Sequence, residues 1–422
     1  MSKKHKKYNL VELFSGIGSQ IEALEKIGAD VEVLNTCEWN YHSILAYSLM
    51  HNNMDRADIF FEGTKLELVD YLLTLGISND GKNPINKAGL TCLNSMALQK
   101  IYRSIKVTNN LVDISKVKGE DLSDNIDILT YSFPCQDLSN VGAFHGYKQG
   151  IDRDAHNRSG LLWEVERILL ERKKEDLYLP HFLLMENVPA LNSYRHRKNF
   201  EEWQEQLQSL GYYNKQYLLN ASDFGLPQNR ERLFMLSILT YNDPDIEVSI
   251  EEFFKEHDLE NIAYRKSLKI EEPKLKNFLR TDYRKKKYKD EAIESQPNAT
   301  QSRKDIWEDN LKLTDAKGRV KDTFTATITT KQDRNPNSGN LRVNFNNGKA
   351  EFRYLTPREC FLLMGFLEED YDKLLEGNFY IKKNAKVFTR DNLIKMAGNS
   401  IAVNVLEEIF RQVIDLDEML FL

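Results

Sequence analysis

Short apolar runs alternate with amphipathic stretches along the first 239 residues of this 422-residue chain. The apolar runs predict strands at 8–14, 31–37, 111–114, 126–133, 182–185 and 233–239. The amphipathic stretches predict helices at 20–27, 45–53, 65–75, 161–171 and 200–210. Such alternation predicts an α/β fold of the Rossmann-like type, with a doubly wound, mostly parallel sheet.

After about residue 240 this alternation ends and the sequence becomes polar, rich in Lys and Asn. Short strands are predicted at 324–329 and 341–345, and helices at 357–364 and 402–414. We therefore predict a large domain over 1–239, a smaller, β-rich domain over 240–352, and a segment over 353–422 that returns to the large domain.

Composition is that of an ordinary globular protein, with 41% apolar and 29% charged residues. No apolar run approaches the length of a membrane span, and no signal-peptide core follows the lysine-rich start. The 4 cysteines form no CxxC pair and the 8 histidines no HExxH motif, which argues against disulfides and a metal centre. We expect a cytoplasmic protein without a membrane partner or a metal.

Basic residues are concentrated in one segment, 265–289, although the net charge of the chain is −6. This segment includes Lys285, Lys286 and Lys287. A basic run can be a solvated helix face or a contact surface for the phosphates of a nucleic acid. Its position within the predicted smaller domain favours the phosphate contact.

The predicted strand at 126–133 ends at Pro134-Cys135-Gln136. Open α/β sheets bind their ligands at the carboxyl ends of the strands, which makes Cys135 a candidate nucleophile. The alternative is a buried structural cysteine. Glu186 ends the strand at 182–185 and is expected at the same edge, where a carboxyl group could act as a general acid or remain an ordinary strand-end carboxylate.

The first strand-to-helix turn reads Phe14-Ser15-Gly16-Ile17-Gly18. Glycines at such a turn let the backbone approach a ligand, but a simple tight turn is equally compatible with them. Ile21 replaces the third glycine of a dinucleotide fingerprint, which weakens the alternative of a nicotinamide oxidoreductase. Glu38 lies about 20 residues on, where an acidic side chain can bind ribose hydroxyls.

Five motifs follow one another along the chain: 14–18, 134–136, Glu186-Asn187-Val188, Gln228-Asn229-Arg230-Glu231-Arg232 and Gly398-Asn399-Ser400. Together they resemble the DNA (cytosine-5)-methyltransferases, over nearly the whole chain. The catalytic motifs are most similar to the subgroup that includes CpG-methylating enzymes. The resemblance implies transfer of a methyl group from S-adenosylmethionine to C5 of a flipped-out cytosine in double-stranded DNA, in a restriction-modification system or as an orphan or phage enzyme.

The resemblance also implies the site residues. Those implied for the cofactor are Phe14, Ser15, Gly16, Ile17, Gly18, Glu38, Trp39, Asp113, Ile114, Pro134, Leu161, Asn399 and Ile401. Those implied for catalysis are Cys135, Gln136, Glu186, Arg230 and Arg232, with Cys135 attacking C6 and Glu186 contacting N3. Gln228 and Thr323 are implied for DNA contact, which makes 240–352 a target-recognition domain, and the basic residues Lys285, Lys286 and Lys287 are added from their charge.

Two stretches depart from the family pattern. The glycine-punctuated stretch at 137–157 is predicted to be a loop that closes over DNA, but it has Val141 where some relatives carry a small polar residue that assists base flipping. Around Thr323, Asp322 and Phe324 replace residues of a Pro-Thr-Leu-Thr signature.

Two other functions remain open for the same fold. RNA could be the substrate, although the long region at 240–352 favours double-stranded DNA. The chain could also be a catalytically silent DNA-binding protein, although the presence of Cys135, Glu186 and Arg232 together argues against this. We expect a monomer, with a restriction endonuclease as a possible functional partner.

Overall fold

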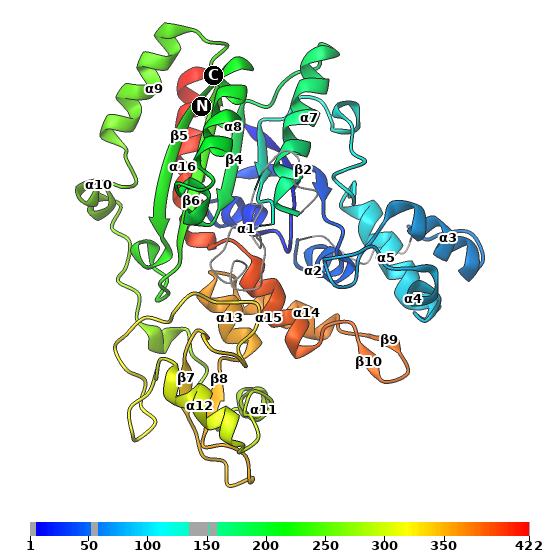
Figure 1. Cartoon of the computed structure of the whole chain (residues 1–422), viewed down its shortest axis with the longest axis vertical. Coiled ribbons are helices and arrows are strands. Elements are labelled where there is room, and N and C mark those ends of the chain that lie inside the picture. The colour runs from blue at the N-terminus through cyan, green and yellow to red at the C-terminus, as the bar shows by residue number, and fades with distance from the viewer. Residues whose placement is uncertain (1–5, 52–57, 135–150, 152–157, 422) are drawn as a thin grey trace, which may run out of the picture.

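The computed structural model describes residues 6–51, 58–134, 151 and 158–421. Its centre is a six-stranded sheet in the order β2-β1-β3-β4-β6-β5 (Figure 1). The strands are β1 (Lys7–Leu13), β2 (Asp30–Cys37), β3 (Ile128–Tyr131), β4 (Phe182–Asn187), β5 (Tyr212–Asn220) and β6 (Glu231–Leu239). β1 to β4 pair in parallel, and β6 runs antiparallel to β4 and β5. The sheet confirms the predicted fold class.

Both faces of the sheet are buried, as expected for parallel strands covered by helices. Leu10 and Leu184 belong to one apolar core, whereas Val11 and Met185 belong to a second core on the opposite face. Helices that contribute to the first core include α1 (Ser19–Lys26), α2 (Tyr41–His51), α5 (Ser95–Val107) and α16 (Val403–Leu420). The second core contains residues of α7 (Leu162–Lys174) and α8 (Arg197–Ser209). The sheet is therefore doubly wound.

Two further helices, α3 (Lys65–Leu75) and α4 (Lys87–Thr91), lie beside α5 and α2 (Figure 1). The bounds of α3 coincide with the prediction because both of its ends carry local signals. Thr64 and Glu67 form a capping box at its start, and Gly76 closes it with φ 78°.

Within the first 239 residues, one predicted strand is wrong and one strand was not predicted. At 111–114 no strand forms among the described residues: Asn110 makes a single bridge with Thr36, and Val112 then takes φ 64°, which ends the extended backbone. β5 was not predicted because it is an edge strand with half-buried polar residues, and its sequence lacks a clean apolar alternation.

Residues just after 240 remain attached to the large domain. α9 (Pro244–Glu256) lies beside β5, where the rings of Phe254 and Tyr217 are 6.2 Å apart and Lys215 pairs with Asp258 at 3.3 Å. α10 (Ile262–Ser267) follows it (Figure 1). We therefore propose that the boundary between the domains lies beyond α10 and not at 239/240.

The smaller lobe, at the bottom of Figure 1, contains α11 (Lys286–Glu294), α12 (Gln301–Asp309), β7 (Asn340–Arg342) and β8 (Phe352–Tyr354). This lobe contains more helix than was predicted, since a β-rich domain was expected over this region. The stretch predicted as a strand at 324–329 makes only one bridge in the described structure, between Thr325 and Gln228.

The C-terminal segment ends in a helix that packs on the large domain. It contains α13 (Pro357–Leu363), α14 (Glu368–Glu376), β9 (Tyr380–Lys382), β10 (Ala385–Lys386), α15 (Arg390–Asn399) and finally α16. α16 packs against α1, and Asp417 near its end pairs with Lys6 at 2.8 Å. Among the residues described, no helix combines the length and apolar character needed to cross a membrane.

Candidate active site

Glu186 and Arg232 come together at one edge of the sheet. Glu186 lies near the end of β4, and Arg232 lies near the start of the antiparallel neighbour β6. The Glu186 Oε1 atom is 3.2 Å from Arg232 Nε, and Ser132 Oγ donates a hydrogen bond to Glu186 Oε2 at 2.6 Å. The Glu186 side chain is only 8% exposed. A guanidinium and a hydroxyl thus fix the orientation of a buried carboxyl group.

The chain segment that leads to Cys135 is tied to the same edge. Asn187 Nδ2 donates to the carbonyl oxygen of Phe133 at 3.1 Å, one residue after the Ser132 hydroxyl that contacts Glu186. Pro134, which is half-buried, is the last residue described before the gap. Cys135 and Gln136 lie outside the described residues, as do Val141 and nearly all of the predicted loop at 137–157.

Arg230 is buried, with 4% of its surface exposed, at a junction of three segments. Its guanidinium donates to the carbonyl oxygens of Ile328 (3.1 Å), Gly398 (3.3 Å) and Ser400 (2.7 Å). These contacts hold the start of β6 against the smaller lobe and the end of α15. A catalytic role for Arg230 stays a prediction, and the contacts just described are those of a structural residue.

Gln228 belongs to the same junction and is fully buried. Its Nε2 atom donates to the carbonyl oxygen of Leu363 at 2.7 Å, and its Oε1 atom accepts from the backbone of Ile328 at 2.8 Å. In this conformation Gln228 packs within the junction without exposed surface, and its predicted contact with DNA stays untested. Thr323 lies half-buried on the adjacent stretch, and its contact with DNA stays a prediction.

The predicted basic segment is partly neutralised by acidic residues. Lys286 pairs with Asp290 at 2.6 Å, and Lys287 pairs with Asp372 of α14 at 3.3 Å. The ammonium of Lys285 lies 5.3 Å from the centre of the Tyr288 ring. Part of this charge therefore joins α11 to α14, and contact of the three lysines with phosphates stays a prediction.

The glycine turn after β1 has the geometry of a ligand loop. Gly16 and Gly18 take φ values of 56° and 82°, which favour glycine. The backbone N–H groups of Ser15 and Gly16 donate to Cys37 O and Glu38 Oε2, both at 3.2 Å. A Cβ atom added to Gly16 would meet nothing within 4 Å, so space is open above the turn.

The segment after α15 contacts the start of the helix that follows this turn. The backbone N–H of Ile401 donates to Ser19 Oγ at 3.2 Å, immediately after Gly18. Ile401 is buried, whereas Asn399 is exposed. Phe14 is half-buried at φ 58°, and Ile17 is buried in the first core.

Glu38 lies beside the glycine turn, and a residue that the sequence did not single out holds it there. Asn110 Oδ1 accepts from the backbone N–H groups of Glu38 (3.1 Å) and Val112 (2.8 Å), and Asn110 Nδ2 donates to Glu38 O at 3.1 Å. The turn that carries Asp113 is therefore joined to the end of β2. Asn110 belongs to no motif, and its only sequence signal is its position after an amphipathic helix.

Burial raises the pKa of Glu38 to about 7, although hydrogen bonds from the backbone of Asn40 and Gly16 act in the opposite direction. The remaining residues predicted around the cofactor are Trp39, Asp113 and Leu161, all half-buried, and Ile114, which is buried in the second core. Asp113 accepts a hydrogen bond from the Ser115 hydroxyl at 2.7 Å.

Comparison with known proteins agrees with this arrangement. Residues 83–415 match the family described as C-5 cytosine-specific DNA methylase. The chain is 34% identical to the orphan methyltransferase M.SssI of Spiroplasma monobiae, over 97% of this chain and 98% of that protein. It is 33% identical to the type II methyltransferase M2.ScrFI of Lactococcus lactis subsp. cremoris, over 95% and 97%.

In fold, the structure resembles the crystal structure of the S. pombe Dnmt2 methyltransferase, with a TM-score of 0.56 and 17% identity, over 99% of this chain and 100% of that one. The family match covers most of the chain, and the two relatives align with it almost from end to end. The chain therefore belongs to the C-5 cytosine-specific DNA methylase family and is a DNA cytosine-C5 methyltransferase.

Proposed function

We propose that this methyltransferase uses S-adenosylmethionine, the methyl donor of its family, and attacks a flipped-out cytosine of double-stranded DNA with Cys135. The observation that carries the proposal is the contact of Glu186 with Arg232 and Ser132 at the edge of the sheet. The sequence leads from Ser132 to Cys135 in three residues, so the nucleophile and the carboxyl group would act on one base.

The chemistry requires both groups because C5 of cytosine is a weak nucleophile. Addition of the Cys135 thiolate to C6 forms an S–C6 bond and moves electron density to C5. A proton shared between Glu186 and N3 stabilises the negative charge that this addition creates. When bound, S-adenosylmethionine would supply an electrophilic methyl group to C5 and leave as S-adenosylhomocysteine. Loss of the C5 proton to a base and cleavage of the S–C6 bond then release 5-methylcytosine and restore the thiolate.

The glycine turn and its neighbours fit an adenosyl cofactor. The space above Gly16 is open, and the Glu38 carboxylate beside it can accept hydrogen bonds from ribose hydroxyls. Asp113 would bind the adenine amino group, and Trp39 and Ile401 would line the pocket. We further propose a monomeric cytoplasmic enzyme, with DNA recognition by the smaller lobe and a restriction endonuclease as functional partner where one is present.

Cofactor affinity is expected to fall as the pH drops through about 7, the pKa of Glu38. Ribose hydroxyls bind the ionised carboxylate best, so affinity is full above this pKa, and the dissociation constant rises by up to about tenfold per pH unit below it. Isothermal titration with S-adenosylhomocysteine between pH 5.5 and 8.5 measures the effect. Glu38→Gln should bind more weakly and without this pH dependence; the same dependence in the variant would contradict the assignment.

A covalent trap tests the proposed reaction. In a duplex with 5-fluorocytosine at the target base, fluorine cannot leave C5 as the proton does, so the S–C6 bond is expected to persist after methyl transfer. We expect a protein–DNA adduct stable to denaturing electrophoresis with the wild type and none with Cys135→Ala. Labelling of tRNA and not of duplex DNA would favour RNA as the substrate, and a well-folded protein that traps neither would favour a silent DNA-binding protein.

A further inference from the structure

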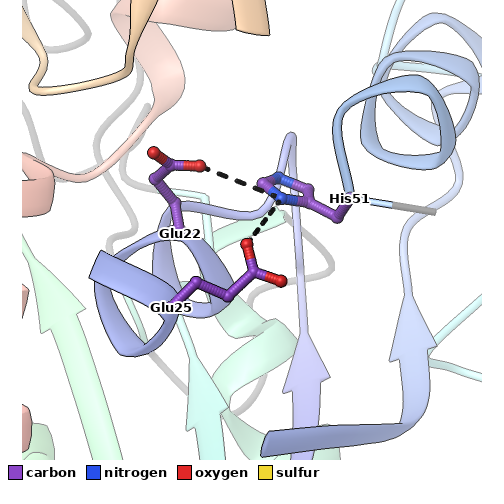
Figure 2. A group of neighbouring side chains, drawn as sticks. All are labelled: Glu22, Glu25 and His51. Atoms are coloured by element: carbon purple, nitrogen blue, oxygen red, sulfur yellow. Dashed lines mark ion pairs between the residues drawn. The ribbon is translucent and has the colours of Figure 1, made fainter. Parts of the chain in front are cut away.

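Behind the glycine turn lies a second group of ionisable side chains that the methyl transfer does not use (Figure 2). Glu22 and Glu25 are three residues apart on one face of α1, and His51 is the last residue of α2. His51 Nδ1 lies 3.9 Å from Glu22 Oε2 and 4.0 Å from Glu25 Oε2. The side chains of His51 and Glu22 are 2% and 4% exposed, whereas that of Glu25 is 52% exposed.

The hydrogen bond at His51 Nε2 determines whether Nδ1 presents a proton or a lone pair to the two carboxylates. His51 Nε2 lies 2.9 Å from the carbonyl oxygen of Ile17, which can only accept, so Nε2 carries the proton. Burial also lowers the pKa of His51 to about 4, which keeps the ring neutral. Nδ1 therefore presents a lone pair to Glu22 and Glu25. Histidines that bind metals commonly have their second nitrogen fixed in this way by a carbonyl oxygen.

Carboxyl groups crowd around this lone pair. Glu22 Oε1 is buried without a hydrogen-bond partner in the part of the chain that the structure describes. Burial, and after it the nearby carboxylate of Asp370, raise the pKa of Glu22 to about 8. Two ammonium groups act on these carboxyl groups, but their ion pairs are made with other acids: Lys26 pairs with Glu407 and Lys373 with Asp370. A proton shared between two carboxyl groups or a bound cation would relieve this repulsion.

We propose that Glu22, Glu25 and His51 bind one divalent cation that accepts mixed nitrogen and oxygen ligands, such as Zn²⁺ or Co²⁺. In a tetrahedral site with bonds of about 2.1 Å, neighbouring ligand atoms are about 3.4 Å apart. Small rotations of the side chains would therefore shorten the distances from His51 Nδ1 to Glu22 and Glu25, now 3.9 Å and 4.0 Å, to this value. The exposed Glu25 provides the entry path.

Such a cation would stabilise the cofactor turn. His51 holds Ile17 through Nε2 and packs so closely on the turn that a Cβ atom on Gly18 would lie 2.6 Å from Nε2. A cation on Nδ1 would fix the ring and, through it, the backbone at 17–18. The role of the cation would be structural, because its ligands lie far along the chain from Cys135, Glu186 and Arg232.

A second group of two carboxyl groups and one histidine provides a control. One side-chain atom of each of Asp127, His181 and Asp417 lies within 4.8 Å of the other two. There, however, the ammonium group of Lys6 lies 2.8 Å from an oxygen of each carboxylate and already supplies the positive charge. We expect this second group to bind no divalent cation.

The test is isothermal titration of the chelator-treated full-length protein with Zn²⁺, followed by thermal unfolding with and without the ion. We expect one equivalent bound and a raised Tm for the wild type and for His181→Gln. The affinity for Zn²⁺ should fall at least tenfold in Glu22→Gln, His51→Gln and Glu25→Gln. Because the Glu25 side chain is exposed, the last variant should fold like the wild type. Absence of saturable binding, or equal binding by these three variants, would overturn the proposal and leave a proton shared by Glu22 and Asp370.

Discussion

Replacing Glu186 with glutamine is expected to lower the rate of methyl transfer by about two to four orders of magnitude. The amide keeps the shape of the side chain and can still contact Arg232 and Ser132, which now lie 3.2 Å and 2.6 Å from the carboxylate. It cannot share an acidic proton with N3, so addition of the thiolate to C6 loses its assistance. Single-turnover kinetics with tritiated S-adenosylmethionine measures the rate, and isothermal titration should show an unchanged affinity for the cofactor product.

Glu201→Gln is the matched control, because it makes the same chemical change at an exposed ion pair with Arg197 on α8. Its methylation rate should equal that of the wild type. A Glu186→Gln enzyme that methylates within about threefold of the wild-type rate would exclude Glu186 from the proposed proton sharing.

Replacing Gly398 with alanine is expected to impair methylation by disturbing the junction of the lobes. A Cβ atom at this position would lie 2.5 Å from the backbone carbon of Thr329 and 2.6 Å from the backbone nitrogen of Thr330, so the backbone of the smaller lobe must move. The carbonyl oxygen of Gly398 also accepts a hydrogen bond from Arg230. Such overpacking costs about 1–3 kcal/mol of unfolding free energy.

Denaturant unfolding and DNA methylation assays measure both effects of Gly398→Ala. Gly89→Ala in α4 is the control, since the three atoms nearest to its added methyl group belong to the side chains of Ile85 and Asn86 and none to the backbone of another segment. We expect the control to keep full activity, because α4 lies outside the junction of the lobes. A Gly398→Ala protein with wild-type stability and a wild-type rate of methylation would show that the close approach at Thr329 is not required.

Much of the large domain could be predicted from the sequence because its signals are local. The buried parallel strands are continuous apolar runs, and Gly16 and Gly18 mark the first turn by their backbone conformation. Parallel neighbours also place their carboxyl ends together, which is why Glu186 could be assigned to the catalytic edge before its contact with Arg232 was known.

What the sequence could not predict depends on contacts between distant segments. Arg230 bonds to Ile328 and Ser400, which are 98 and 170 residues away, and Gln228 bonds to Ile328 and Leu363. The motif predicted a catalytic role for Arg230 and a DNA contact for Gln228, and it gave no sign of the packing that holds both in the junction. Lys287 likewise lies in a basic run, but its partner Asp372 comes from a helix 85 residues further on.

The most direct test of the central claim is expression of the protein in a host that lacks cytosine methylation, followed by bisulfite sequencing of the host DNA. Cys135→Ala is expressed in parallel under the same conditions. We predict 5-methylcytosine at one position of a short sequence motif with the wild type and none with the variant. An unmethylated genome in cells that contain folded, cofactor-binding wild-type protein would contradict cytosine methylation of DNA, and equal methylation by the variant would contradict Cys135 as the nucleophile.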